Sequence, residues 1–425
     1  MIKKIITLTV LIIAINSYSQ KNNISPYSFF GIGDLNEAKT TFEQSMGGVG
    51  TSFNSSYRLA FSNPASLASL KLTTYALAGE NKYTVVDNGT DAQGSSSFSL
   101  SYLALGFPVG KNGGATFGVQ PYSKVGYNIL NRYQNSINET ESDLFSGNGS
   151  TNRVFVGYGY KLPYNISLGV EASYVFGNLE RIILHRDEEH LDRLASRYRI
   201  QSDVNGYSLK FGVQNSFKIN DKISLKSGLN ILLESKLNNK GNESLISLQN
   251  SSNPDVLNPR DLLFERDFEG EVIMPVKSTL SVGLGENLKW FAGIEYSMQQ
   301  PLSFSTSFTQ NNNIITYGDS NNLAFGGFYT PKAESITSYW QRVTYSAGVH
   351  AKETGLIINN TSIKDFGISF GVSLPSKRQL SNFNLGFDIG NRGEINNNGL
   401  VKENYYNFRL GLSLNDKWFK KRKLD

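Results

Sequence analysis

The sequence has no cysteine among its 425 residues. This absence excludes disulfide bonds, a thiolate metal site, a cysteine nucleophile and a lipid-anchored N-terminal cysteine. After residue 20 the chain also lacks any run that approaches the roughly 18 consecutive apolar residues of a membrane-spanning helix. We therefore exclude a membrane protein built from helices.

Long charge runs and linker-like stretches are scarce as well. The chain has 41 basic and 36 acidic residues, and the basic residues line neither a helix nor a stripe, so nucleic-acid binding gains no support. No Pro-rich or Ser-rich stretch divides the sequence. A single large architecture is therefore the simpler interpretation.

The motifs of common catalytic sites are also missing. We find no nucleophile elbow, phosphate-binding loop or zinc-helix motif, and we expect neither an enzyme nor a bound cofactor. His185 and His190 flank Asp187, Glu188 and Glu189, a pattern that superficially suggests a cation site. A solvated charged loop is the favoured interpretation, and we predict no metal site.

The N-terminus has the features of a secretory signal peptide. Lys3 and Lys4 precede an apolar run over 5–15 and a small-residue stretch that ends at Gln20. Because the run is too short for a spanning helix, we predict that residues 1–20 are a signal peptide removed on export.

Apolar and polar residues alternate with a period of two along most of the remaining chain. Near the C-terminus, apolar side chains occupy every second position, at Phe366, Ile368, Phe370, Val372 and Leu374. Successive side chains of a strand point to opposite faces, so each such stretch predicts a strand with one apolar face. The strands are long, and short turns alternate with long polar excursions, which favours a membrane barrel over a soluble β protein.

This pattern predicts fourteen strands. They cover residues 72–86, 95–107, 113–128, 151–162, 165–184, 204–219, 222–236, 271–284, 288–302, 320–330, 341–352, 365–375, 381–392 and 402–415. The excursions around 129–150, 185–200, 237–270 and 303–319 are predicted to be extracellular loops.

The expected fold is all-β: a 14-stranded antiparallel transmembrane β-barrel over residues 71–416, placed in the outer membrane of a Gram-negative cell. An even number of strands puts both mature termini on the periplasmic side, so residues 417–425 are predicted to be a basic periplasmic tail.

Residues 21–70 show no long alternation but contain two short motifs. These are MGGVG at 46–50 and FSNPAS at 61–66. In these motifs the sequence resembles the FadL-like family of outer-membrane transporters for long-chain fatty acids and other hydrophobic compounds. The resemblance is closest to a Bacteroidota-type branch, through SPYSFFG at 25–31 and LNDKWFKKRK at 414–423.

The resemblance implies that residues 21–70 form a hatch in the barrel lumen, with Gly47, Gly48, Asn63, Pro64 and Ala65 as its motif residues. It also implies passive transport, with ligand captured by the extracellular loops and passed laterally past the hatch. Outer-membrane lipid and a hydrophobic small molecule are the implied partners. From their own chemistry, the glycines and the Asn-Pro turn favour a structural role over ligand contact.

Pro121 interrupts the third predicted strand. Because proline removes a ladder donor, a bulge or kink should follow near Gly118 and Tyr122. A kinked third strand resembles the lateral opening of FadL-like barrels, and we expect these three residues to mark the ligand path. A rim bulge that merely ends strand pairing is the alternative.

Charged residues of both signs fall on the predicted inward face. We expect them to form a network with one another, with the hatch or with water; its main members are Glu171, Glu295, Asp365, Asp388 and Arg409. Mixed charge argues against an open pore that selects ions of one sign.

A second function stays open. Trp418 and Phe419 precede the basic residues 420–423, which fits an interface anchor or a docking tail. FadL-like barrels also serve as non-transporting subunits in protein secretion or outer-membrane assembly. The resemblance therefore also implies other outer-membrane or periplasmic proteins as partners.

Overall fold

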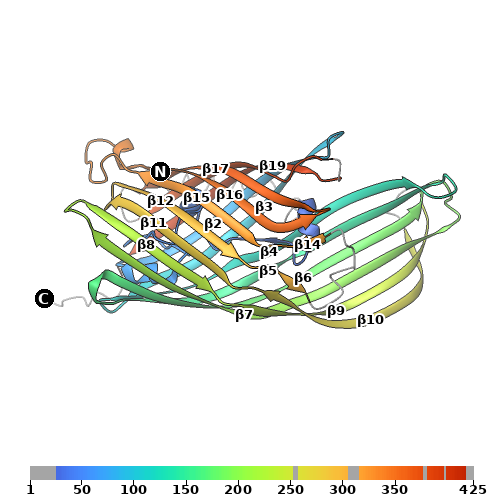
Figure 1. Cartoon of the computed structure of the whole chain (residues 1–425), viewed down its shortest axis with the longest axis horizontal. Coiled ribbons are helices and arrows are strands. Elements are labelled where there is room, and N and C mark those ends of the chain that lie inside the picture. The colour runs from blue at the N-terminus through green and yellow to red at the C-terminus, as the bar shows by residue number, and fades with distance from the viewer. Residues whose placement is uncertain (1–24, 252–256, 305–314, 377–380, 397–398, 418–425) are drawn as a thin grey trace.

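The computed structural model describes residues 25–251, 257–304, 315–376, 381–396 and 399–417 (Figure 1). The predicted signal peptide and residues 418–425 of the predicted tail lie outside these ranges. No helix in the described part of the chain is long and apolar enough to cross a membrane.

Fourteen antiparallel wall strands close into a barrel, in which the last strand pairs with the first. Single strands are β2 (Thr73–Asp87), β3 (Ala92–Val109), β4 (Gly113–Gln134), β5 (Thr140–Lys161), β6 (Ile166–Asp187), β7 (Leu194–Lys218), β16 (Thr344–Ile358), β17 (Thr361–Pro375), β18 (Asn382–Arg392) and β19 (Lys402–Asp416). Interrupted strands are β8 (Ile223–Leu232) with β9 (Ser235–Gln249), β10 (Asn258–Met274) with β11 (Lys277–Glu286), β12 (Trp290–Gln299) with β13 (Ser303–Phe304), and β14 (Ile315–Tyr317) with β15 (Ser320–Tyr329).

Each of the predicted strands falls on one of these wall strands, so the predicted fold class is confirmed. The turns at the short-loop end are tight. One of them is the 3-10 turn η3 (Pro163–Asn165), where Tyr164 and Asn165 have positive φ angles of 61° and 58°.

The predicted extracellular loops around 129–150, 185–200 and 237–270 are wrong in their secondary structure, because most of these residues are strand. They form a sheet that continues past the 10-residue strands β11 and β12, and we call it the protruding sheet: 123–134 of β4, 140–151 of β5, 177–187 of β6, 194–206 of β7, β9 and β10. Both of its faces carry many polar side chains. A strand that is solvated on both sides loses the period-two signal that revealed the wall strands. Of the fourth predicted loop, residues 305–314 lie outside the described ranges.

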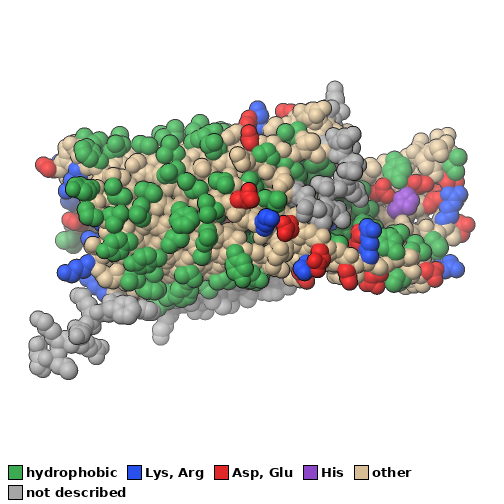
Figure 2. Space-filling model, turned by 60° about the horizontal axis from the view of Figure 1, so that its bottom comes forward, with side chains coloured by type: hydrophobic (Ala, Val, Ile, Leu, Met, Phe, Trp, Pro, Cys, Tyr) green, Lys and Arg blue, Asp and Glu red, His purple; other side chains and the backbone are tan. Residues whose placement is uncertain are grey.

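The outer face of the wall is apolar. Phe366 and Phe370 remain 47% and 50% exposed, and similar side chains recur on the other wall strands. Figure 2 shows hydrophobic side chains spread over the barrel, whereas charged side chains gather on the protruding sheet and at the short-turn end. A continuous apolar band of this size on a closed barrel is the surface that lipid covers.

Residues 25–70, here called the N-terminal segment, lie against the inward-facing side of the wall. The short helix α2 (Thr41–Gln44) contacts β17, β18 and β19, whereas the 3-10 helix η2 (Pro64–Ser69) packs on β4 to β7. Wall glycines permit this approach. A Cβ atom at Gly169 would collide with the backbone at Pro64 and Ala65.

Candidate functional site

The Asn-Pro motif caps the helix η2. Asn63 Oδ1 accepts a hydrogen bond from Ala65 N at 3.0 Å, and Pro64 occupies the first turn. Asn63 Nδ2 donates to the carbonyl oxygens of Thr51 at 3.0 Å and of Val213 on β7 at 3.1 Å. The asparagine therefore joins two parts of the N-terminal segment to the wall, while Ala65 is fully buried.

The glycines of the other motif form a turn against β16. Gly47 and Gly48 have positive φ angles of 66° and 91°, and a Cβ at Gly47 would lie 2.7 Å from Val349 N. L side chains rarely adopt such φ angles, and here no space exists for one. Both motifs thus fit the chain tightly to the wall.

Glu43, at the start of α2, is a functional carboxylate that was not predicted. It is fully buried and accepts hydrogen bonds from Thr40 N at 2.7 Å and from Phe61 N and Ser62 N at 3.1 Å each. Thr40 and Glu43 form a capping box at the start of α2. The spacing T-x-x-E was a visible signal for this role.

Glu295, a predicted network residue on β12, holds the turn after the glycine motif. Its Oε2 accepts hydrogen bonds from Gly50 N at 2.9 Å and Thr51 N at 2.8 Å, and Lys39 Nζ lies 3.4 Å from Oε1. A wall carboxylate thereby satisfies backbone donors that would otherwise be buried without partners.

Glu171 on β6 lies in a separate group. Arg153 and Lys210 each place a nitrogen 3.0 Å from its Oε1, and Lys210 also donates to Phe61 O at 2.8 Å. Two cations and one carboxylate are almost fully buried together here. The predicted network is therefore divided into several clusters around the lumen.

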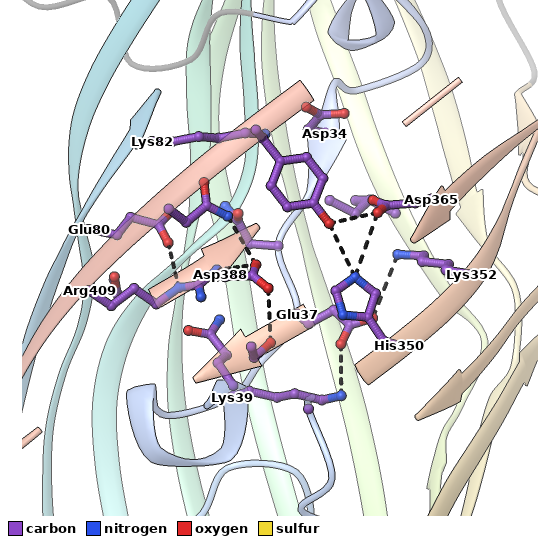
Figure 3. A pocket seen from close by; sticks show the side chains of 18 of the residues that line it. Asp34, Glu37, Lys39, Glu80, Lys82, His350, Lys352, Asp365, Asp388 and Arg409 are labelled. Carbon is purple, nitrogen blue, oxygen red and sulfur yellow. Dashed lines mark hydrogen bonds and ion pairs between the residues drawn. The ribbon is translucent and has the colours of Figure 1, made fainter. Parts of the chain in front are cut away.

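The other three predicted residues lie together beside a cavity of about 220 Å³ (Figure 3). Arg409 pairs with Asp388 at 3.4 Å and with Glu80 at 3.1 Å. Asp365 accepts a hydrogen bond from the Tyr405 hydroxyl at 2.8 Å.

Charge and amide groups dominate the lining of this cavity. Lys39 and Lys352 contribute ammonium groups on one side, and both pair with Glu37 of the N-terminal segment, at 2.9 and 3.6 Å. Lys82 makes no ion pair with any described residue. A second cavity of about 370 Å³ shares several of these residues and is also lined by charged side chains, including Lys210 and Lys277. The lining of the first cavity suits water or a polar ligand and penalises an apolar one. The second cavity also has apolar side chains in its lining, including Leu35, Met274 and Leu302.

The predicted kink in the third wall strand coincides with a break in the wall. The β4–β5 ladder has a bulge between Pro121 and Ser123, and pairing of β3 with β4 ends at Leu103 and Val119. Gly118 lies in the paired part, where a Cβ would come within 2.6 Å of Leu103 O.

The N-terminal segment fills this break. Its strand β1 (Asp34–Leu35) pairs with β4, with Leu35 opposite Ser123, and Asn36 N donates to Tyr122 O at 2.9 Å. Tyr122 packs against an apolar cluster that includes Ile32 of the same segment. The segment thus covers the edge of β4 beside the gap by backbone pairing and by apolar packing.

The charged loop that carries His185 and His190 has a different arrangement from the one that the sequence pattern suggests. His190 Nε2 lies 2.9 Å from Glu139 Oε1, and Asp187 is close to both, whereas His185 pairs with Asp143 at 2.8 Å. Glu139 was not predicted, because it comes from the preceding hairpin.

Arg193 already neutralises the acidic side chains of this loop. It donates to Glu139 and, at 2.7 Å, to Asp187. The hydrogen bond from Arg193 lowers the pKa of Glu139, and backbone N–H groups of His190 and Glu189 lower the pKa of Asp187. A guanidinium in this position favours a salt-bridged loop.

The closed wall and its apolar outer face define the class: an outer-membrane β-barrel, with the N-terminal segment packed against the inner side of its wall. The family model described as BamG matches residues 1–425, so the chain belongs to the BamG family. No curated protein sequence matches the chain.

Solved structures with the same fold are FadL-like, which confirms the predicted resemblance. A FadL homologue from Pseudomonas aeruginosa has a TM-score of 0.58 and 14% identity, covering 91% of this chain and 99% of that one. The Pseudomonas putida toluene transporter TodX has a TM-score of 0.58 and 15% identity, with coverage of 91% and 99%. CymD, a monoaromatic hydrocarbon channel, has a TM-score of 0.57 and 14% identity, with coverage of 89% and 98%. At these identities the similarity establishes the fold.

Proposed function

We propose that this protein is a non-transporting barrel subunit of an outer-membrane protein secretion or assembly complex. The observation that carries the proposal is the lumen beside Pro121, which is charged and is closed by the N-terminal segment. An importer of hydrophobic molecules needs an apolar path at this place. Instead, an apolar molecule there would meet Glu80, Lys124 and Arg409, whose ion pairs it would have to displace.

In this proposal residues 21–70 act as a fixed plug and both mature termini lie in the periplasm, as expected for a barrel with an even number of strands. Residues 1–20 are the export signal and residues 417–425 the periplasmic tail. The protruding sheet then lies outside the cell and offers a large surface to other proteins. Outer-membrane lipid surrounds the wall, and no catalytic role is assigned.

A second candidate is passive import of long-chain fatty acids or other hydrophobic compounds. It is favoured by the early end of β3–β4 pairing at Leu103 and Val119 and by the bulge after Pro121. Structures with the same fold include a toluene transporter and a monoaromatic hydrocarbon channel. Lateral passage here requires β1 and its neighbours to leave the edge of β4.

The experiment that separates the candidates is extraction of the tagged native protein in mild detergent, followed by mass spectrometry of both proteins and lipids. Stoichiometric partner proteins without enriched ligand would support the subunit. A barrel that runs alone at every detergent concentration and carries fatty-acyl or other apolar ligand would overturn it and support import.

A further inference from the structure

Among the described residues, the outer edge of β10 is open over most of its length. This strand has 17 residues and pairs with β9 from end to end. On its other side, β10 pairs only through Val272 and Ile273 with β13, as far as the described residues show. From Asn258 to Asp267 no described strand covers this edge, which forms the rim of the protruding sheet (Figure 1).

An open edge of this length is unusual. It presents a row of backbone N–H and C=O groups that can template pairing with another chain, and most proteins cover or shorten such edges. The membrane-spanning wall avoids the problem by closing on itself, but β10 runs past the end of its wall neighbour β12.

The side chains at the centre of this edge are apolar. Leu262 and Leu263 are 57% and 58% exposed, and Phe264 is 39% exposed. The ladder with β9 has an irregularity at this point, so Leu263 has no partner residue on β9. Covering these three side chains would remove apolar surface from water, which favours association.

The charged side chains along the edge that lack an ion-pair partner among the described residues are carboxylates. Arg266 pairs with Glu243, and Lys240 pairs with Glu269 at 2.7 Å. By contrast, Glu265 and Asp267 have no cation within ion-pair distance among the described residues. These two carboxylates are two positions apart and share one face of the strand.

We infer that the β10 edge binds an extended segment of a partner protein by strand addition. Apolar side chains of that segment pack against residues 262–264, and its Lys or Arg side chains lie opposite Glu265 and Asp267. The backbone supplies affinity and the side chains supply specificity. The identity of the partner as a subunit of the same complex rests on the proposed function. Strand addition at the β10 edge can be tested independently of that function.

The direct test uses the purified full chain in nanodiscs and a fluorescent decapeptide of alternating lysine and valine. We expect saturable binding that weakens about tenfold when alternate peptide nitrogens are methylated, because strand addition needs the donors. The double variant Glu265→Lys/Asp267→Lys should weaken binding by a similar factor. The matched control Asp221→Lys/Glu334→Lys makes the same charge change in exposed turns and should bind normally. Equal binding of the methylated peptide, or equal affinity of the two variants, would overturn the inference.

The same variants distinguish this inference from the proposed function. Loss of partner proteins from the extracted complex in Glu265→Lys/Asp267→Lys, but not in the control, supports both. Retention of the same partners by both variants overturns the edge as the docking site and leaves the subunit proposal standing. Light scattering that shows a dimer abolished by the edge variant would replace the partner by a second copy and overturn the partner assignment.

Discussion

Single carboxylates hold the N-terminal segment in place by accepting hydrogen bonds from backbone N–H groups. Glu43 does this from within the segment and Glu295 from the wall. The inward position of Glu295 on an alternating strand predicted its place in the lumen. No such pattern marks Glu43, because a capping box predicts only a helix start, whereas the contacts to Phe61 and Ser62 arise from tertiary folding.

Replacing Glu43 with alanine should loosen the segment. The N–H groups of Phe61 and Ser62 would stay buried without an acceptor, at a cost of about 3 kcal/mol. We expect the segment of Glu43→Ala to be cut by protease at lower urea concentrations than in the parent, while Glu334→Ala, an exposed control, behaves normally. Equal protease resistance in the two variants would show that Glu43 is dispensable.

The loop network of Glu139, Asp187 and Arg193 should open in acid. Both carboxyl pKa values are lowered in the folded protein, so the stabilisation is present above the ordinary carboxyl values near 4 and is lost as the pH falls through the lowered ones. Protection of residues 188–193 against hydrogen exchange, measured relative to the intrinsic rate at each pH, should therefore fall below about pH 4. Arg193→Ala should exchange rapidly already at pH 7, and protection that persists unchanged in this variant would contradict the assignment.

At the level of strands, wall elements were predictable and the protruding sheet was not. The prediction 381–392 and the observed β18 (Asn382–Arg392) agree because lipid on one side and lumen on the other impose strict alternation. In β10 the same chain has Arg260 and Asp261 followed by Leu262, Leu263 and Phe264. Apolar and polar residues do not alternate there. The register and length of β10 therefore depend on its pairing with β9, and the local sequence does not specify that pairing.

The two proposed functions differ in whether strand β1 must leave the edge of β4. A disulfide between the two strands can hold β1 in place and so test the difference. Leu35 and Ser123 are opposite each other on antiparallel strands, a separation that a disulfide can bridge. Because the chain has no native cysteine, Leu35→Cys/Ser123→Cys should give a single oxidised species, whereas Leu35→Cys/Val156→Cys, with Val156 on the outer face, should not.

The locked protein should keep its partners and support growth as well as its reduced form, because a structural subunit needs no movement of β1. Cells that carry the oxidised variant would be compared with reduced cells for fatty-acid uptake and for recovery of the complex. Uptake that is lost on oxidation and restored by reductant would contradict the subunit proposal.

At the scale of the whole molecule, the barrel wall is suited to lipid and the protruding sheet is suited to water. The apolar wall anchors the chain in the membrane, and the protruding sheet places polar and apolar side chains beyond it (Figure 2). The fold was accessible from sequence through the alternation, and a hatch over residues 21–70 was expected from the resemblance that the two motifs carry. The ion pairs that hold the segment against the wall were not accessible from sequence, because Asp34, Glu37 and Lys39 find their partners on distant strands.

A barrel that is closed by its own N-terminal segment should not conduct ions. We expect the full chain, reconstituted in planar bilayers, to show a flat baseline, because the segment contacts strands on opposite sides of the lumen. A variant that lacks residues 21–70 should form open channels, since its lumen would retain the charges of Glu171, Arg153 and Lys210 and fill with water. Heat-dependent gel mobility would verify that the truncated barrel is folded. Steady conductance by the full chain would mean that the segment leaves a continuous aqueous path, and the picture of a fixed plug would then fail.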